Sequence, residues 1–163
     1  MDLSAQTGVI VQRLVALLKH YAISKFGSVR RTTSPKAISV AGLAPLYGIA
    51  RDALEQGRTS PIRLYHGSRN PQGLYLVKEL RTFTDRYDNF SYTPCISGDA
   101  MSADGYAQGQ AIDVALDDVG KLAGWRVFLC GNPEMVKTAK KKAFLSGAAI
   151  QDIYADAFTL AAA

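Results

Sequence analysis

A predicted strand, a glycine turn and a helix start follow one another directly in one stretch of this chain. Residues 125–129 (WRVFL) are apolar, aromatic or β-branched, which is typical of a short buried strand. Cys130 and Gly131 come directly after this run. Asn132 and Pro133 then start a helix, because asparagine caps helix N-termini and proline suits the first helical position. In an open α/β sheet, ligands bind where such strands end.

The same alternation of strand and helix patterns recurs from residue 37 onward. We expect strands at 37–41, 62–66, 90–96, 125–129 and 149–154, and helices at 43–56, 73–84, 111–119 and 133–146. The last helix has apolar residues at helical spacing, namely Met135, Val136, Ala139, Ala143 and Phe144. Alternation of this kind predicts βαβ units. The expected fold class is therefore α/β, a three-layer doubly wound parallel sheet with the first strand central and an extra N-terminal helix.

Composition divides the chain into an N-terminal segment, 1–36, and a domain, 37–163. The net charge of +5 lies in the first part, where six basic residues face one acidic residue. Residues 4–25 have the apolar spacing of an amphipathic helix, and residues 28–35 form a basic linker. This segment is either an accessory or partner-binding helix, or a membrane-surface or organellar targeting segment.

Charge and residue counts argue against several classes of function. The basic excess is confined to one segment, and the rest of the chain has no basic stripe with interleaved aromatic residues, so nucleic-acid binding is not expected. No apolar run approaches the roughly 20 residues that span a bilayer, and no secretory signal is expected. Two cysteines and two histidines indicate neither a disulfide framework nor a metal site. We therefore expect a cytoplasmic protein without a metal.

Two further strand ends carry turn chemistry. The turn Gly42-Leu-Ala-Pro45 joins a glycine to a helix N-terminus, which suits a phosphate but also suits a simple tight turn. Ser68 and Arg69 follow the second strand, where dinucleotide folds hold the adenosine ribose or its 2′-phosphate. Alternatively, this is a solvated turn in which Arg69 pairs with a nearby acid.

The end of the 125–129 strand allows two interpretations. Gly131 has no Cβ, and Cys130 is small, so a flat ring could approach closely here. Alternatively, Cys130 is a buried structural cysteine. No histidine neighbours Cys130 in sequence to make it a covalent nucleophile.

Five motifs occur in order along residues 37–158. They are GLAP (42–45), LYHGSRNP (64–71, followed by Leu74 and Tyr75), PCIS (94–97), CGNPEM (130–135) and IYADAF (153–158). Together they resemble the NAD(P)-binding domain of the ferredoxin–NADP reductase superfamily, in particular its bacterial oxygenase-reductase branch. Members of that branch pass electrons from NAD(P)H through FAD to an iron–sulfur centre.

The resemblance implies a role for each matching position. The implied cofactor-binding residues are Gly42, Leu43, Ala44, Pro45, Gly67, Ser68, Arg69, Tyr75, Ser97, Gly131, Pro133 and Met135, and the implied catalytic residues are Cys130 and Phe158. Residues 42–45 would lie under the pyrophosphate and the nicotinamide end, and residues 67–69 with Tyr75 would surround the adenosine end. Ser97 would border the cleft between them.

The same resemblance assigns the hydride-transfer end of the site. Cys130 and Gly131 would face the nicotinamide ring where hydride leaves for flavin N5, with Pro133 and Met135 shaping the cofactor site. Phe158 is similar to a C-terminal aromatic residue that covers the flavin in relatives, and Asp156 to an acid close to it.

Two features depart from the family pattern. The family's loop has Gly-Thr-Gly before an apolar residue, alanine and proline, whereas this chain has Val40-Ala41-Gly42. A β-branched Val40 would be strained at a loop position that requires a positive φ. The FAD-binding β-barrel that precedes this domain in the family is expected to be absent, because residues 1–36 are too few and have a helical pattern.

The resemblance implies an NAD(P)H-binding oxidoreductase domain that would deliver hydride to a flavin, for transfer to an iron–sulfur or other electron acceptor. FAD would come only through a partner or a missing domain, so we expect a flavin-bearing or iron–sulfur electron-transfer protein as partner. The alternative is a non-catalytic interaction or regulatory protein, or a degenerate fragment, which Val40 and the missing barrel favour. A flavodoxin-like FMN carrier is disfavoured, since no Ser/Thr-rich phosphate loop follows the first strand.

Overall fold

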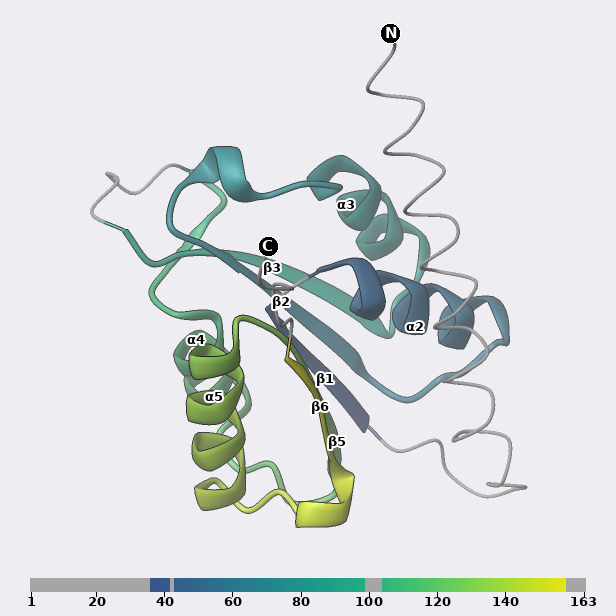
Figure 1. Ribbon diagram of the computed structural model, residues 1–163. Helices are drawn as coiled ribbons and strands as arrows, with labels where there is room; N and C mark the ends of the chain where they lie inside the picture. Colours follow the sequence, from purple (N-terminus) through teal and green to yellow (C-terminus); the bar gives the residue numbers. More distant parts are fainter. Residues whose placement is uncertain (1–35, 42, 99–103, 158–163) are drawn as a thin grey trace, which may run out of the picture.

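The computed structural model describes residues 36–41, 43–98 and 104–157, which form a six-stranded parallel sheet covered by helices (Figure 1). The strands are β1 (Lys36–Ala41), β2 (Ile62–Ser68), β3 (Phe90–Ile96), β4 (Ala107–Gln108), β5 (Trp125–Gly131) and β6 (Ile153–Ala157). Their order is β4-β3-β2-β1-β5-β6, and every neighbouring pair is parallel. The predicted α/β class and the central position of the first strand are confirmed.

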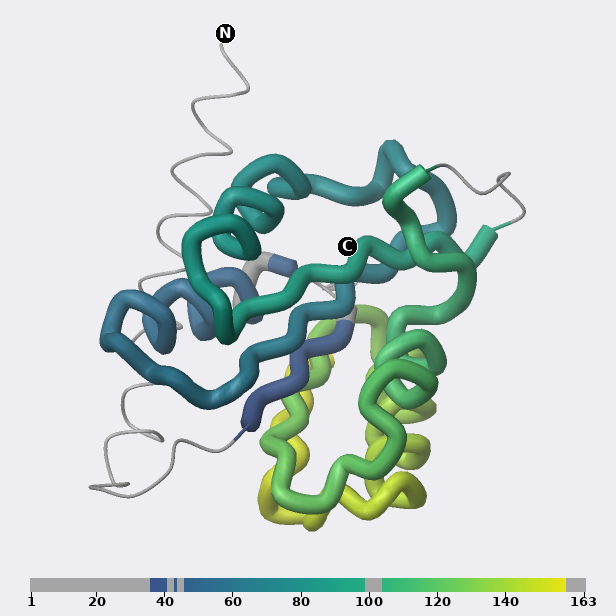
Figure 2. Tube along the Cα trace, turned by 180° about the vertical axis from the view of Figure 1, so that it is seen from behind, coloured from purple at the N-terminus to yellow at the C-terminus, as the bar shows by residue number. Residues whose placement is uncertain are grey.

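Helices cover both faces of this sheet, which makes three layers (Figures 1 and 2). The helices are α2 (Leu43–Glu55), α3 (Val77–Arg86), α4 (Ala111–Val119) and α5 (Pro133–Leu145), with 3₁₀ turns η1 (Pro71–Gly73) and η2 (Ile150–Asp152). Helices α2 and α3 lie on one face, and α4 and α5 lie on the other. The extra N-terminal helix and linker predicted for 1–36 lie almost entirely outside the described residues, so that division of the chain stays a prediction.

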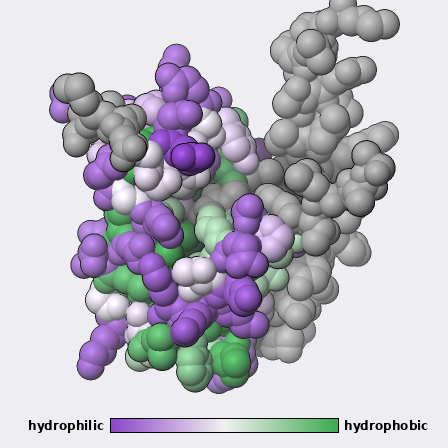
Figure 3. Space-filling model, turned by 60° about the vertical axis from the view of Figure 1, so that its left-hand side comes forward, coloured by the Kyte–Doolittle hydropathy of each residue, from purple (hydrophilic) through white to green (hydrophobic). Residues whose placement is uncertain are grey.

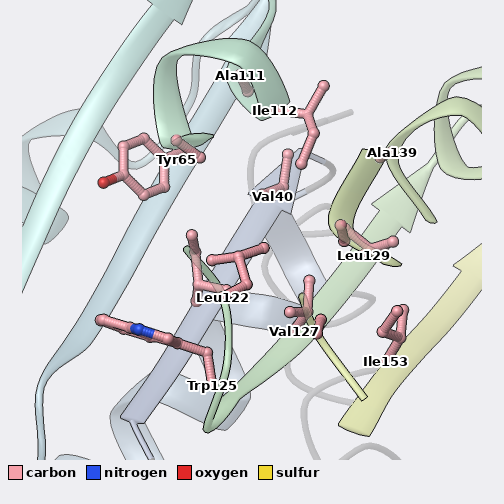
Figure 4. Close-up of a cluster of buried hydrophobic side chains, with 14 of the residues drawn as sticks. Val40, Tyr65, Ala111, Ile112, Leu122, Trp125, Val127, Leu129, Ala139 and Ile153 are labelled. Carbon is pink, nitrogen blue, oxygen red and sulfur yellow. The ribbon is translucent and has the colours of Figure 1, made fainter. Parts of the chain in front are cut away.

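Each face of the sheet has its own hydrophobic core, because successive strand residues point to opposite sides. Figure 4 shows the core under α4 and α5. Its larger members are Ile38, Val40, Tyr65, Ile112, Leu122, Trp125, Val127, Leu129 and Ile153. The core under α2 and α3 contains Leu43, Leu46, Leu54, Ile62, Leu64, Leu80, Phe90, Phe128 and Cys130. Burial of apolar area on both faces is the main force that holds such a sheet.

Two strands are longer than the sequence pattern predicts. β2 continues past His66 to Ser68, and β5 continues past Leu129 to Gly131. Glycine is unfavourable inside strands, so we expected a turn at each glycine. Pairing overrides that tendency: Gly67 lies beside Cys95 of β3, and Gly131 pairs with Ala157 of β6.

Helix α3 starts four residues later than predicted, at Val77 instead of residue 73. Pro71–Gly73 forms the 3₁₀ turn η1, and Leu76 adopts a left-handed conformation with φ 56°. A left-handed residue cannot belong to a right-handed helix, so α3 begins only after Leu76. The last strand also starts late, at Ile153, because residues 150–152 form η2.

The apolar face of α5 is narrower than its sequence spacing indicates. Val136, Ala139 and Ala143 are buried, whereas Phe144 is 55% exposed. Leu145 and Ile150 are exposed as well, and hydrophobic residues are visible at the lower edge of the face in Figure 3. Phe144 thus matches the helical spacing of apolar residues but lies outside the buried face of α5.

Val40 is an ordinary buried strand residue. It lies inside β1, beside Tyr65 of β2 and Leu129 of β5, and is 1% exposed. Among the described residues, the only non-glycine residue with a positive φ is Leu76. The expectation of a strained valine in a phosphate loop is therefore wrong, and Val40 does not support the non-catalytic alternative.

The described residues contain neither a helix that could span a membrane nor a cluster of metal-binding side chains. None of these helices has the length and hydropathy to cross a membrane. The same residues contain no group of three or more histidine, cysteine, aspartate or glutamate side chains that could hold a metal ion.

Candidate functional site

The carboxyl ends of the parallel strands meet on one side of the sheet, which we call the carboxyl edge. Strands β1, β2, β3, β5 and β6 end there at Ala41, Ser68, Ile96, Gly131 and Ala157. Every predicted site residue that the structure describes lies in a segment that ends or begins at this edge. Gly42 and Phe158 lie outside the described residues, and Ala44 and Pro45 belong to the first turn of α2.

The N-terminus of α2 carries a contact from a distant part of the chain. The backbone N–H of Leu43 donates to Tyr75 Oη at 3.1 Å, across 32 residues of sequence. The Leu43 side chain is fully buried in the core under α2, while Tyr75 is 47% exposed. Two predicted site residues are thus in direct contact.

The turn that carries Tyr75 is built by its own polar and small residues. Asn70 Oδ1 accepts from the N–H of Gly73 at 3.1 Å, and Leu74 N–H donates to the carbonyl of Pro71 at 3.1 Å. A Cβ on Gly73 would lie 2.0 Å from Ser68 Oγ, so this close approach favours glycine. We call residues 68–75 the Tyr75 turn.

His66 lies under this turn and is almost completely buried. Its Nδ1 is 3.3 Å from Tyr92 Oη, and its ring meets the Tyr75 ring edge-on with centroids 5.2 Å apart. Burial lowers the pKa of His66 to about 4, so the ring is neutral at pH 7. Burial also raises the pKa of the Tyr92 hydroxyl, which stays protonated. Three uncharged polar side chains, Tyr92 of β3, His66 of β2 and Tyr75, are therefore in contact one after another.

His66 belongs to one of the five sequence motifs but had no predicted role, and Tyr92 was not predicted as a site residue. The alternation of side chains along each strand could have indicated both residues. His66 follows Ile62 and Leu64 at a spacing of two, and Tyr92 follows Phe90, so both point to the face covered by α2 and α3.

The ends of β2 and β3 are joined by backbone hydrogen bonds. The N–H of Ser97 donates to the carbonyl of Ser68 at 2.9 Å, and its hydroxyl donates to the same oxygen at 3.3 Å. The N–H of Gly98 donates to the carbonyl of Arg69 at 3.0 Å. A Cβ on Gly98 would lie 2.3 Å from that carbonyl oxygen, so the close approach depends on glycine. The Ser97 hydroxyl thus helps to join the ends of β2 and β3 at the carboxyl edge.

Gly67 and Arg69 are exposed, and Ser68 is half-buried. Among the described residues, no acidic side chain forms an ion pair with Arg69. The interpretation that Arg69 pairs with a neighbouring acid therefore has no support in this part of the chain.

Cys130 and Gly131 end β5 beside the start of α2. Cys130 is 1% exposed and belongs to the same core as Leu43, and it pairs in register with Ala41. Burial, with a smaller effect of Asp156, raises the pKa of the Cys130 thiol to about 12. The thiol is therefore neutral and is not a nucleophile at pH 7.

Helix α5 begins at Pro133, two residues after Gly131, which has φ 142°. Asn132 Oδ1 accepts from the N–H of Glu134 at 2.9 Å, and Pro133 occupies the first helical turn, as predicted. Met135 is half-buried and packs against the core under α4 and α5. Gly131 and Pro133 thus lie at the carboxyl edge, while Met135 packs the N-terminal turn of α5 against the core.

Three comparisons with known proteins agree with this arrangement. A family model described as oxidoreductase NAD-binding domain matches residues 41–141, more than half of the chain. The ferredoxin–NAD(P)+ reductase component of the naphthalene 1,2-dioxygenase system of Pseudomonas putida is 38% identical over 117 residues, covering 72% of this chain and 35% of that protein. The reductase component of propane 2-monooxygenase from a Gordonia species is 34% identical over 122 residues, covering 73% and 35%.

The fold also matches solved structures. The Amycolatopsis cytochrome P450 reductase superposes with a TM-score of 0.72 and 30% sequence identity, covering 78% of this chain and 38% of that one. The chain thus spans between 35% and 38% of the length of these three relatives. Its matched residues include α2, the Tyr75 turn, the end of β5 and the start of α5. The chain belongs to the oxidoreductase NAD-binding domain family.

Proposed function

We propose that this chain binds NADPH or NADH across the carboxyl edge and presents the nicotinamide to a flavin held by a partner chain or by another domain. One observation carries this proposal: the α2 N-terminus, the Tyr75 turn and the Cys130-Gly131 strand end all reach one edge of the sheet. Three separate segments of a family NAD-binding domain thus end or begin at the same edge of the sheet.

The α2 N-terminus suits the pyrophosphate. The first amides of a helix lack partners within the helix and attract anions through the helix dipole. Leu43 holds this end of α2 against the sheet, since its side chain is fully buried. In our proposal Gly42, Leu43, Ala44 and Pro45 approach the phosphates with their backbone.

The Tyr75 turn suits the adenosine end. Ser68 and Arg69 lie at the end of β2, where dinucleotide folds hold the ribose. An exposed guanidinium can form paired, charge-assisted hydrogen bonds with a 2′-phosphate. We therefore propose NADPH as the preferred cofactor. Gly67 and Ser97 border this part of the cleft.

The end of β5 suits the nicotinamide. Gly131 has no Cβ, so its backbone can approach a ring closely, while the neutral Cys130 thiol is buried in the core and leaves its backbone for this contact. When bound, the reduced nicotinamide supplies a hydride, which is one proton and two electrons, to the flavin. The protein residues fix the position of the ring: Cys130 and Gly131 border it, and Pro133 with Met135 sets the start of α5 beside it.

The proposed electron acceptor is inferred from the relatives of this chain. The relatives are named as reductase components of oxygenase systems, one of them as a ferredoxin–NAD(P)+ reductase component. We propose that a flavin-bearing protein or domain takes the hydride from this chain and that an iron–sulfur protein is the next acceptor. Phe158 is proposed to cover the flavin, as the family resemblance implies.

Titration calorimetry with NADH and NADPH, each in the presence and absence of FAD, tests this function. We expect at least one nucleotide to bind with a dissociation constant below one millimolar, which corresponds to a binding free energy of about −4 kcal/mol or better. FAD alone should produce no binding heat. Absence of binding for both nucleotides at millimolar concentration would refute the cofactor role and support the non-catalytic interaction protein. Tight binding of FAD alone would contradict the assignment of the flavin to a partner.

A further inference from the structure

The oxygen of Tyr75 already occupies an amide of the α2 N-terminus. Leu43 N–H donates to Tyr75 Oη at 3.1 Å. In the proposed function, which this inference extends, the same helix end receives the pyrophosphate. One N–H makes one well-aligned hydrogen bond, so a phosphate oxygen and the tyrosine oxygen compete for it.

The His66–Tyr92 pair and the Tyr75 turn hold the Tyr75 hydroxyl at the α2 N-terminus. The buried His66 ring meets the tyrosine ring at 81°, and Tyr92 in turn contacts His66 Nδ1. The Asn70–Gly73 hydrogen bond fixes the turn from which Tyr75 extends. The arrangement in which Tyr75 Oη accepts from the Leu43 N–H, which we call closed, is therefore supported by the sheet and by the turn.

Tyr75 is also able to leave. Its side chain is 47% exposed, so rotation toward solvent requires no movement of the core. Side-chain rotation of exposed residues is fast and needs no change in the sheet. The supports of the closed arrangement, His66 and Tyr92, lie in β2 and β3 and would stay in place.

We propose that Tyr75 is a closing residue, whose hydroxyl caps the α2 N-terminus in the ligand-free protein and has to release the Leu43 amide before a phosphate group binds. Only open molecules bind the phosphate, so the apparent affinity equals the affinity of the open form multiplied by the fraction of molecules that are open. Binding of the dinucleotide is then a competition between its phosphate and a residue of the same chain.

The test uses the full chain and the variant Tyr75→Phe, which keeps the ring and its contact with His66 but removes the oxygen. The matched control is Tyr87→Phe: Tyr87 is half-buried just before β3, at the opposite edge of the sheet. Calorimetry measures the dissociation constants of NADPH and of inorganic pyrophosphate for the three proteins. Circular dichroism verifies that each variant is folded.

Tyr75→Phe is expected to bind both probes about two- to tenfold more tightly, the change that corresponds to one ordinary hydrogen bond. Tyr87→Phe should match the original protein. Unchanged or weaker binding by Tyr75→Phe would overturn the closing role, and weaker binding would assign the hydroxyl as a direct ligand.

A kinetic measurement gives a second, independent result. In stopped-flow mixing with NADPH, release of Tyr75 by fast side-chain rotation predicts an observed rate that rises linearly with concentration in both proteins, with a steeper slope for Tyr75→Phe because all of its molecules are open. Equal slopes in the two proteins would overturn the proposal. Failure of the proposed function is distinguishable, because then neither the original chain nor Tyr75→Phe binds either probe.

Discussion

Val40 of β1 and Leu129 of β5 are register partners in the parallel sheet, and both side chains are buried in the core under α4 and α5. Val40 thus occupies a position at which the family pattern has a glycine, yet it is part of the fold and not of a damaged loop. The consequence can be tested directly.

The first prediction concerns Val40→Gly. Loss of a buried side chain and the added freedom of glycine in a strand should lower the free energy of unfolding by about 2–4 kcal/mol. Dinucleotide binding should not become tighter. Urea unfolding measures the first effect and calorimetry the second, with Val40→Ala expected at an intermediate stability. Tighter NADPH binding by Val40→Gly would contradict the structural role of Val40.

The second prediction concerns Gly98→Ala. The new Cβ would lie 2.3 Å from the carbonyl oxygen of Arg69, so the backbone must shift and the hydrogen bond between these residues must weaken. We expect a loss of about 1–3 kcal/mol in the free energy of unfolding. The control, Gly124→Ala, has φ 76° but open space around it, and should cost about 1 kcal/mol. Equal losses in the two variants would contradict the steric explanation.

The third prediction concerns His66 and pH. Because burial lowers the pKa of His66 to about 4 from 6.5, the unfolded chain binds a proton in a pH range where the folded chain does not. The stabilisation is therefore complete above pH 6.5 and is lost as the pH falls toward 4, by on the order of 3 kcal/mol.

Replacement of His66 by phenylalanine removes the titrating group while keeping a ring beside Tyr75. Thermal unfolding between pH 4 and pH 7 should show a shallower dependence for His66→Phe than for the original chain. Parallel curves for the two proteins would show that His66 does not titrate in this range.

The fourth prediction concerns the two thiols. Burial raises the pKa of both Cys95 and Cys130 to about 12, so almost no thiolate exists in the folded chain at pH 8. Ellman's reagent should label neither cysteine in the native protein and both in urea. Because the unfolded thiols ionise near their ordinary pKa, stability should also fall as the pH rises above about 9. Rapid native labelling of Cys130 would contradict the assignment of a neutral thiol.

The fifth prediction concerns Arg69→Ala. If the guanidinium binds the 2′-phosphate, its loss should weaken NADPH about 10- to 100-fold and leave NADH nearly unchanged, since charge-assisted hydrogen bonds contribute roughly 1.5–3 kcal/mol. Arg86→Ala is the control, because Arg86 lies at the C-terminal end of α3 and contacts Tyr87. Equal weakening of NADPH and NADH would refute the 2′-phosphate role.

The sequence predicted strands β1, β2, β3, β5 and β6 and the central place of β1, because each of these strands has enough apolar residues for one or both faces of a parallel sheet. It did not predict the two-residue strand β4. It underestimated β2 and β5 where glycine occurs inside a paired strand, at Gly67 and Gly131. It also placed the start of α3 too early, because the hydrogen bond from Gly73 to Asn70 that forms η1 depends on side-chain geometry.

The candidate site was predicted in its parts but not in its connections. Strand ends and turn residues indicated the carboxyl edge. The contact between Leu43 and Tyr75 joins segments 32 residues apart, and no local pattern contains such a pairing. The roles of His66 and Tyr92 likewise follow from which strands lie side by side, which only the folded sheet shows.

Leu43 has its amide at the candidate site and its side chain, with no exposed surface, in the core that attaches α2 to the sheet. In the proposed function, ligand affinity and resistance to unfolding are therefore linked through a single residue. A dinucleotide that binds this amide should raise the melting temperature with its concentration, as mass action requires. Amide hydrogen exchange at Leu43 would then measure, in one signal, closure by Tyr75, occupancy by the cofactor and the anchoring of the helix.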